Sequence, residues 1–346
     1  MSGQQRGAMA WLLRGVLSLV EPAYSQIVSW RNRRFDIGKG VLKLPRPVIS
    51  IGNITAGGTG KTPVVRWLCE QLRNADRHPA VLMRGYKSKG GRSDEQQMLE
   101  QTLNPSTRSP IIVHANPNRF EGGNEVLREH PEMDVFVLDD GFQHRRLHRD
   151  FDLVLINATE PFGFKHVHPR GLLREPLNGL QRADAIMITR SDEVDPARVK
   201  EIEQEIQRHC PDMPIVHASH APVQLLDGDS RRGLADLANK RTFAFCAIGD
   251  PESFFRQVKK LAGELVGTQA FPDHHAYGET ELSSLMALAN KAEVMICTEK
   301  DWAKIASLPR TAMPLWRLEM AIQFREGDEA RLLSRMVQSG LNGHLT

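Results

Sequence analysis

The chain has few cysteines, little net charge and no long hydrophobic run. Its four cysteines are scattered along 346 residues without the spacing of a metal site or a disulfide framework, which indicates buried thiols in a reducing compartment. No stretch of about 18 apolar residues is uninterrupted, so a membrane-spanning helix is not expected. The net charge of +3 provides no strong field for a polyanion, and we expect no nucleic-acid partner.

The segment at residues 47–63 has the layout of a phosphate-binding loop. Its β-branched run at 48–51 predicts a buried strand. A glycine-rich turn follows, and Pro63 stands where a helix begins, at a position that tolerates proline. Strand, glycine loop and helix start in this order are typical of a nucleoside triphosphate site, although the strict pattern has glycine where this chain has Thr55. The alternative is an ordinary glycine turn with an exposed lysine.

The residue types of this loop suit a triphosphate. Its glycines allow several N–H groups to point into one concavity, and the helix N-terminus adds partial positive charge. Lys61 can reach the β- and γ-phosphates, and the Thr62 hydroxyl can bind Mg²⁺. The residues expected to bind the nucleotide are Thr55, Ala56, Gly57, Gly58, Thr59, Gly60, Lys61 and Thr62.

A second signal lies at residues 134–140, where an apolar run ends in Asp139 and Asp140. An apolar strand with a terminal aspartate is the Walker B arrangement, in which the acid holds Mg²⁺ directly or through water. Many strands end in aspartate at a turn, so the pattern gains its meaning from the phosphate loop in the same chain. Which of the two acids contacts the metal stays open.

The most apolar part of the chain is at residues 8–30. Its large apolar side chains fall on one face at helical spacing, Pro22 is expected to break or kink the helix, and three arginines follow at 31, 33 and 34. This combination suits a helix lying in a membrane interface, and a core helix packed on a sheet is the alternative. We expect no signal peptide, because the basic cluster follows the apolar part.

Strands alternate with helices along the rest of the chain, which predicts an α/β fold with mostly parallel sheets in two domains. An extended connector is expected at 215–223, and turn signals at 227–240 mark the change from one series to the next. The expected strands are 48–51, 80–83, 110–114, 134–140, 151–156, 184–189, 242–248, 264–271, 293–298 and 314–324. The expected helices are 63–76, 96–103, 118–130, 196–209, 251–262, 279–290, 300–306 and 328–338.

Four parts are predicted from these features. They are an amphipathic segment at 1–34, a P-loop domain at 35–220, a second, smaller α/β domain at 221–324 and a C-terminal helix at 325–346. Whether that last helix packs back on the P-loop domain is left open by the sequence.

Six motifs occur in a fixed order along the chain. They are 51–62 (IGNITAGGTGKT), 84–86 (RGY), 138–144 (LDDGFQH), 173–176 (LREP), 271–275 (FPDHH) and 298–301 (TEKD). Each motif alone is unspecific, whereas the ordered set is specific. On these motifs the sequence resembles, nearly from end to end, the tetraacyldisaccharide 4′-kinases of lipid A assembly.

The resemblance implies transfer of the γ-phosphoryl group of ATP to the 4′-hydroxyl of an acylated glucosamine disaccharide 1-phosphate, giving lipid IVA. It implies two α/β domains, a P-loop NTPase-like one and a second one, joined by a two-stranded linker, with the substrate in the cleft between them. It also implies a peripheral protein at the cytoplasmic face of the bacterial inner membrane. That setting favours the interfacial interpretation of residues 8–34, with the membrane surface as a partner. We expect a monomer.

Position by position, the resemblance also implies roles for single residues. Asp94 matches the catalytic base and His274 its histidine partner, with His275 as the fallback. The family usually has Gly-Asp-Glu-Pro around the base, whereas Ser93 and Gln96 stand in the places of that glycine and proline here. The expected metal ligands for Mg²⁺ are Thr62, Asp139, Asp140 and Glu175. The expected substrate positions are Arg84, Tyr86, Gln143, Arg170 and Arg174.

The chemistry of these residues is also consistent when the resemblance to the family is left aside. A sugar hydroxyl needs an acceptor for its proton, and kinases use an aspartate for this. A neighbouring imidazole can orient that carboxylate. The alternatives are that Asp94 is an acid favoured at a helix N-terminus and that His274 is a turn histidine. Lys300 and Asp301 suit either a helix start or a nucleotide contact.

Two other functions fit parts of the sequence. A regulatory or partitioning P-loop ATPase or GTPase switch also uses the loop at 57–62, but it has no obvious use for a second α/β domain with an Asp-His-His turn. A membrane-associated binding protein with a vestigial phosphate loop is the third possibility.

Overall fold

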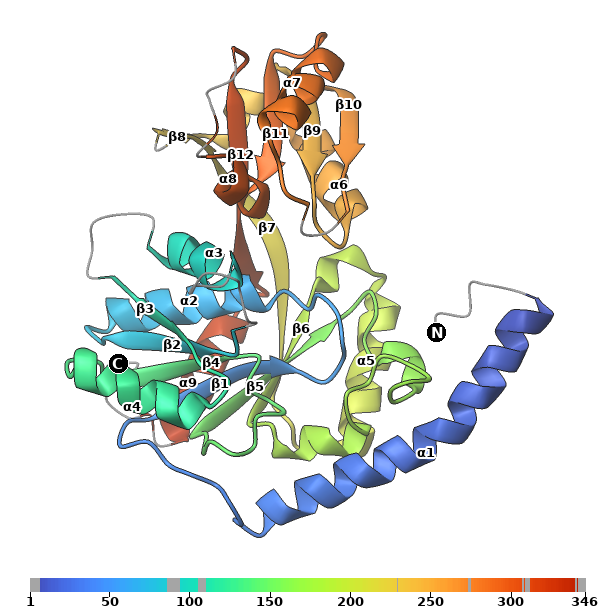
Figure 1. Cartoon of the computed structure of the whole chain (residues 1–346), viewed down its shortest axis with the longest axis vertical. Coiled ribbons are helices and arrows are strands. Elements are labelled where there is room, and N and C mark those ends of the chain that lie inside the picture. The colour runs from blue at the N-terminus through green and yellow to red at the C-terminus, as the bar shows by residue number, and fades with distance from the viewer. Residues whose placement is uncertain are drawn as a thin grey trace. The chain divides into compact units, whose positions relative to one another are not determined.

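The computed structural model describes residues 7–85, 94–104, 110–228, 230–272, 275–306, 308, 312–339 and 341. Contacts group the chain into two compact units. Unit 1 consists of residues 1–220 and 322–346, and unit 2 of residues 221–321. The chain enters unit 2 within strand β7 (Ile215–Asp227) and leaves it within strand β12 (Leu315–Phe324), which are neighbours in the strand order (Figure 1). Unit 1 is therefore built from two separate stretches of sequence.

Unit 1 contains a sheet with the strand order β7-β6-β5-β1-β4-β2-β3, and every neighbouring pair in it is parallel. From β1 the chain turns first to one side of the sheet and later, at β5, to the other. Such a switch point is where open α/β sheets bind ligands. The strands are β1 (Val48–Asn53), β2 (Pro79–Met83), β3 (Ile112–Ala115), β4 (Val135–Asp139), β5 (Phe151–Asn157) and β6 (Ala185–Thr189).

Helices cover both faces of this sheet, because alternate strand residues point to opposite sides. Ile49 and Ile51 of β1 share an apolar cluster with α2, α3 and α9, whereas Val48 belongs to a cluster with α4 on the other face. The second face also carries α5. The helices are α2 (Lys61–Asn74), α3 (Asp94–Leu103), α4 (Arg119–Glu129), α5 (Pro196–His209) and α9 (Asp328–Gln338), with short 3₁₀ turns at η1 (Gly163–Lys165), η2 (Leu177–Arg182) and η3 (Ser191–Glu193).

The first helix, α1 (Ala8–Asp36), continues through Pro22, so a break at that proline is wrong, while a kink there stays a prediction. A proline in a helix removes one backbone hydrogen bond. Docking contacts on either side compensate for that loss: the Glu21 carboxylate accepts from the backbone N–H of Val167 at 2.8 Å, and Val28 is buried. The polar face of α1 thus packs on unit 1.

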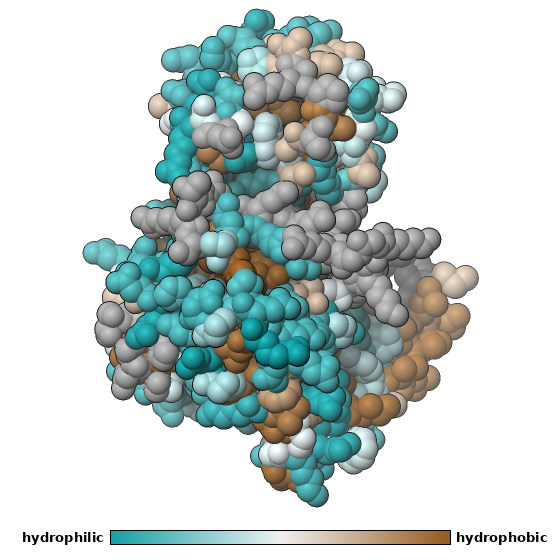
Figure 2. Space-filling view, turned by 60° about the vertical axis from the view of Figure 1, so that its left-hand side comes forward, coloured by the Kyte–Doolittle hydropathy of each residue, from teal (hydrophilic) through white to brown (hydrophobic). Residues whose placement is uncertain are grey.

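The apolar face of α1 points away from the rest of unit 1. Trp11, Leu19 and Trp30 are 76%, 82% and 66% exposed. Figure 2 shows this apolar surface at the far edge, where α1 lies. Within the described part of the chain, no helix combines the length and the apolar character needed to cross a membrane.

Unit 2 has the strand order β10-β9-β11-β12, again parallel, and β8 pairs antiparallel with β7. Helix α6 packs on one face of this sheet, and α7 and α8 pack on the other. The elements are β8 (Ser230–Arg232), η4 (Leu234–Leu237), β9 (Arg241–Cys246), α6 (Pro251–Leu261), β10 (Glu264–Ala270), α7 (Glu279–Leu288), β11 (Val294–Thr298) and α8 (Glu299–Ile305).

The predicted α/β fold with mostly parallel strands is confirmed, and most elements lie within a few residues of their predicted bounds. The extended connector expected at 215–223 lies within β7, where the chain passes from unit 1 to unit 2, and its residues 215–218 also pair with β6. One helix start differs from its prediction. The helix expected to begin at Pro63 begins at Lys61, which leaves the proline in the first turn, where backbone N–H groups have no partner within the helix.

Candidate active site

The glycine-rich loop joins β1 to α2 at the switch point of the sheet. Gly57 and Gly60 have φ of 124° and 79°, a region that favours glycine, and Gly60 is the N-cap of α2. The Thr59 hydroxyl is buried without a hydrogen-bond partner among the described residues. A loop of this shape at a helix N-terminus, with a buried hydroxyl left to be satisfied, fits the phosphates of a nucleotide.

Neighbouring segments hold the loop in place. The Ala56 N–H donates to the Leu172 carbonyl at 2.7 Å, and the backbone N–H of Arg174 donates to the Ile54 carbonyl at 2.8 Å. On the other side, the Thr189 hydroxyl at the end of β6 donates to the Thr59 carbonyl at 3.0 Å. The segment at 172–174, which contains part of the LREP motif, is therefore a wall of the loop.

His220, which the sequence did not single out, packs against Gly60. A Cβ at position 60 would lie 2.6 Å from Nε2 of this imidazole. Burial, with a further effect from the charge of Arg190, lowers the pKa of His220 to about 4. A neutral ring therefore lies beside the phosphate loop at physiological pH. Only the spatial pairing of β7 with β6 brings it there.

The predicted residues Lys61 and Asp140 meet at the end of β4. Lys61 Nζ donates to Asn53 Oδ1 at 3.2 Å and lies 3.4 Å from Asp140 Oδ1. Arg174 Nη1 donates to both Asp140 oxygens, at 3.0 and 2.9 Å. Burial alone would raise the pKa of the Asp140 carboxyl, but the charges of Lys61 and Arg174 outweigh it and hold that pKa below its ordinary value.

The residues expected to bind Mg²⁺ supply oxygen donors, which this ion prefers. Asp139 ends β4, and Asp140 follows with a left-handed φ of 53°, which turns the chain away from the sheet. Thr62 is in the first turn of α2. Among the described residues, no three His, Cys, Asp or Glu side chains gather into a group that could hold a metal ion.

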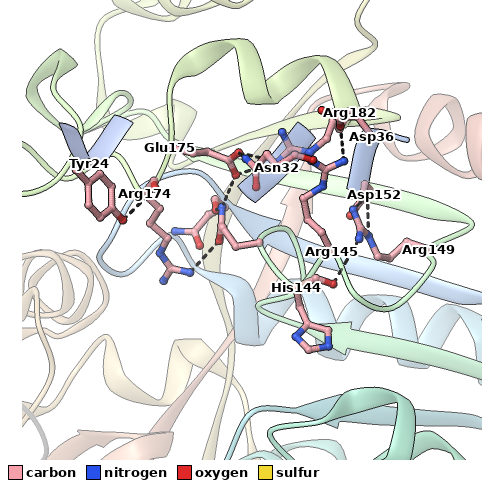
Figure 3. Close-up of polar contacts among 12 residues, drawn as sticks. Tyr24, Asn32, Asp36, His144, Arg145, Arg149, Asp152, Arg174, Glu175 and Arg182 are labelled. Carbon is pink, nitrogen blue, oxygen red and sulfur yellow. Dashed lines mark hydrogen bonds and ion pairs between the residues drawn. The ribbon is translucent and has the colours of Figure 1, made fainter. Parts of the chain in front are cut away.

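Glu175, expected as a metal ligand, is the centre of a buried polar network (Figure 3). Its carboxylate accepts from Arg182 Nη2 at 2.8 and 2.9 Å, from Gln143 Nε2 at 3.0 Å and from Asn32 Nδ2 at 2.9 Å. Gln143 Oε1 accepts from Arg174 Nη1 at 3.1 Å. Three side chains thus already bind the Glu175 oxygens.

His144 follows Gln143 at an electropositive part of the same edge. Burial lowers the pKa of His144 to about 4, and nearby arginines, Arg119 and Arg149 among them, add to this effect. The basic run at 144–146, directly after the Walker B strand, is a sequence signal that could have marked His144.

The other predicted site residues lie on separate segments of the chain. Arg170 Nε donates to Ser18 Oγ of α1 at 3.2 Å, and the Arg84 side chain is exposed after β2. Asp94 is the first residue of α3, but its side chain lies outside the described residues, as do Tyr86 and His274.

The turn after β10 in unit 2 is anchored by a fully buried carboxylate. Asp301 accepts from the Tyr277 hydroxyl at 2.8 Å, from the Ala247 N–H at 2.9 Å and from Thr298 Oγ1 at 2.5 Å. Burial and the charge of Asp301 raise the pKa of Tyr277. Of the two options for the TEKD motif, the contacts of Asp301 fit a helix start, because Thr298 is the N-cap of α8. The His275 ring stacks on Phe271 beside this group.

Comparison with known proteins agrees with this geometry. A family model described as Tetraacyldisaccharide-1-P 4'-kinase matches residues 11–338. The tetraacyldisaccharide 4'-kinase of Syntrophotalea carbinolica is 37% identical over 296 residues, covering 81% of this chain and 79% of that protein. That of Chlorobaculum parvum is 33% identical over 362 residues, covering 96% and 99%.

A solved structure is also similar. It is LpxK from Aquifex aeolicus, described as an "apo" form in complex with ATP, with 28% sequence identity and a TM-score of 0.70, covering 94% of this chain and 99% of that one. These likenesses span almost the whole chain and favour the kinase over the switch and the binding protein. The chain therefore belongs to the tetraacyldisaccharide 4′-kinase family, the ATP-dependent phosphotransferases that phosphorylate tetraacyldisaccharide 1-phosphate.

Proposed function

We propose that the site beside β1 and β4 transfers the γ-phosphoryl group of ATP to the 4′-hydroxyl of the disaccharide, with residues 55–62 holding the triphosphate. The observation that carries the proposal is the meeting of Lys61, Asp140 and Arg174 at the phosphate loop. Lys61 supplies positive charge where negative charge develops during transfer. Bound Mg²⁺ would neutralise phosphate charge, and the residues that would hold it are Thr62, Asp139 and Asp140.

Glu175 takes a different role in this proposal. Its carboxylate is buried and bound by three side chains, whereas the Asp140 side chain is 36% exposed, so we assign Glu175 to orienting Gln143 and, through Gln143, Arg174. Arg174 in turn fixes the Asp140 carboxylate on the side of Lys61. Arg84, Tyr86 and Arg170 remain proposed substrate positions.

Asp94 is proposed as the base that accepts the proton of the sugar hydroxyl, with His274 as its partner. Support for Asp94 comes from its place at the start of α3, in the segment that follows β2 at the carboxyl edge of the sheet. A carboxylate there can accept a hydroxyl proton while the phosphoryl group is transferred.

We also propose that the protein is peripheral to the cytoplasmic face of the inner membrane and works as a monomer. The exposed apolar face of α1 and the arginines at 31, 33 and 34 support the membrane contact.

We further propose that unit 1 is a P-loop NTPase-like domain. In this proposal, β7 and β12 form a two-stranded linker to the second α/β domain.

The test incubates the protein with ATP, Mg²⁺ and detergent-solubilised tetraacyldisaccharide 1-phosphate, and follows a product one phosphate heavier at the 4′ position. Lys61→Ala should lower the rate by two or more orders of magnitude. Asp94→Asn should lower kcat strongly while ATP affinity is kept, and the exposed Asp212→Asn serves as the matched control. A normal rate for Asp94→Asn would remove it as the base, and a normal rate for Lys61→Ala would contradict the whole site.

A further inference from the structure

We propose that Asn32 of α1 is a positioning residue for phosphoryl transfer, so that the proposed membrane helix is also part of the active-site framework. The inference rests on the proposed roles of Lys61 and Asp140. It assigns to α1 a function separate from membrane binding, carried by one buried amide on its polar face.

The first step is the contact between Asn32 and Glu175. Both side chains are buried, with exposures of 9% and 1%, and Asn32 Nδ2 lies 2.9 Å from Glu175 Oε2 (Figure 3). A carboxylate only accepts hydrogen bonds, so Asn32 must present its amino group. Of the three side chains that donate to Glu175, Asn32 belongs to α1, and its hydrogen bond joins residues 143 positions apart in the sequence.

The second step leads from Glu175 to the phosphate loop. Glu175 Oε1 accepts from Gln143 Nε2, and Gln143 Oε1 accepts from Arg174 Nη1. The same Arg174 nitrogen donates to Asp140, which pairs with Lys61. One continuous series of polar contacts therefore runs from the helix to the lysine of the loop. Such a network transmits changes in orientation because each member is held by the next.

The third step is the rigidity of the helix end that presents Asn32. Arg145 Nη1 donates to the Asn32 carbonyl at 2.8 Å, and Nη2 pairs with Asp36 Oδ1 at 2.6 Å (Figure 3). About two helical turns before Asn32, the Tyr24 hydroxyl donates to the Arg174 carbonyl at 3.3 Å. These contacts fix α1 against the residues that orient Asp140, on the side opposite to its exposed apolar face.

The arrangement separates two properties of α1 that a truncation would remove together. The apolar residues at 11, 19 and 30 are exposed, whereas Asn32 is buried. Asn32 points inward and adds nothing to the apolar face. Substitution of Asn32 should therefore change catalysis and leave membrane binding intact.

The experiment compares Asn32→Ala with Gln26→Ala, a matched removal of an amide from an exposed position of the same helix. Both are assayed with detergent-solubilised acceptor and for binding to vesicles of anionic and neutral phospholipids. Asn32→Ala should lower kcat about tenfold, the size expected when one hydrogen bond to a charged group is lost. The KM for ATP and vesicle binding should stay within twofold of the wild-type values, and Gln26→Ala should match the wild type in every measurement.

A double-substitution cycle tests the coupling. Glu175→Gln should lower kcat, and Asn32→Ala in that background should add less than twofold, because both act through Gln143 and Arg174. Asn32→Leu keeps a similar side-chain size without the donor and without a second carboxylate beside Glu175, and it covers the case in which the alanine variant folds poorly, judged by thermal unfolding.

Three results would overturn the inference: wild-type kcat for both Asn32 variants, full additivity with Glu175→Gln, or a loss of stability without a change in kcat. Lys61→Ala is measured in parallel. If that variant is inactive while the Asn32 variants are normal, this inference alone fails. If Lys61→Ala is normal, the proposed site fails first.

Discussion

The imidazole of His220 lies directly against Gly60, at the point where the phosphate loop becomes α2. Any Cβ at position 60 would come within 2.6 Å of Nε2 on that ring. Gly60 also has a φ of 79°, which side-chain-bearing residues rarely adopt. Two independent constraints therefore require glycine here, one from backbone conformation and one from a neighbour that lies 160 positions away in the sequence.

Gly60→Ala should reduce phosphoryl transfer at least tenfold and weaken nucleotide binding. The left-handed backbone costs about 1–2 kcal/mol with a side chain, and the methyl group must displace either His220 or the loop. Kinase assays and titration with a fluorescent ATP analogue check this. Gly233→Ala is the control, because a Cβ there meets its nearest atom only at 4.0 Å. Unchanged nucleotide affinity in Gly60→Ala would contradict the tight fit.

Arg174→Ala should move the acid limb of the kcat/KM profile to higher pH. Arg174 and Lys61 hold the pKa of Asp140 below its ordinary value, so removal of one charge raises that pKa. A carboxyl whose pKa is lowered on folding contributes stability above its unfolded pKa and loses it as the pH falls through the folded pKa. The loss of stability that Asp140 causes on the acid side should also become smaller, because its folded pKa moves towards the unfolded value. Arg198→Ala, an exposed arginine on α5, should leave both profiles in place.

Replacing Trp11 and Trp30 together by alanine should weaken binding to anionic vesicles about tenfold or more. Each exposed ring brings a large apolar area to the interface. Co-sedimentation at several salt concentrations measures the effect, and the arginines beside Trp30 predict a salt-dependent share. Leu288→Ala removes an exposed apolar side chain from unit 2 and should not matter. Equal binding of the double variant and the wild type would exclude this face of α1 as the membrane contact.

Tyr277→Phe should lower the free energy of unfolding by about 1.5–3 kcal/mol, because it removes a buried hydrogen bond to the Asp301 carboxylate. Chemical denaturation of the full chain measures it. Tyr24→Phe is chemically the same change but removes a longer, partly buried bond of 3.3 Å, and should cost clearly less. Similar losses for both variants would mean that burial of the Asp301 group is not what stabilises the turn.

Local patterns in the sequence predicted which residues come together in much of the candidate site. The loop between β1 and Lys61 is one contiguous motif, and the two acids at the end of β4 belong to another. Parallel strands bring their carboxyl ends to one edge of the sheet, so the two motifs meet there. The pairing of Lys61 with Asp140 follows from that rule. Apolar periodicity likewise predicted most helices, and short continuous apolar runs predicted the strands, because central strands such as β1 and β5 are buried on both faces.

Those local patterns could not predict the long-range contacts. Nothing near His220 marks it as a neighbour of Gly60, because only the pairing of β7 with β6 brings the two together. Asn32 is one polar residue in an amphipathic helix, and its partner Glu175 was expected at the metal. Pro22 suggested a break that docking of α1 overrides. In each case tertiary contacts, absent from any local window, decide the outcome.

The interruption of unit 1 by unit 2 has a consequence for the order of folding during synthesis. Trp67 Nε1 donates to Glu329 at 2.7 Å, and Leu332 and Met336 of α9 complete the apolar cluster over the central strands. Those residues leave the ribosome after all of unit 2. Unit 2 is one continuous stretch and can reach its native state first, whereas unit 1 must wait, with part of its core open to water, until α9 is translated.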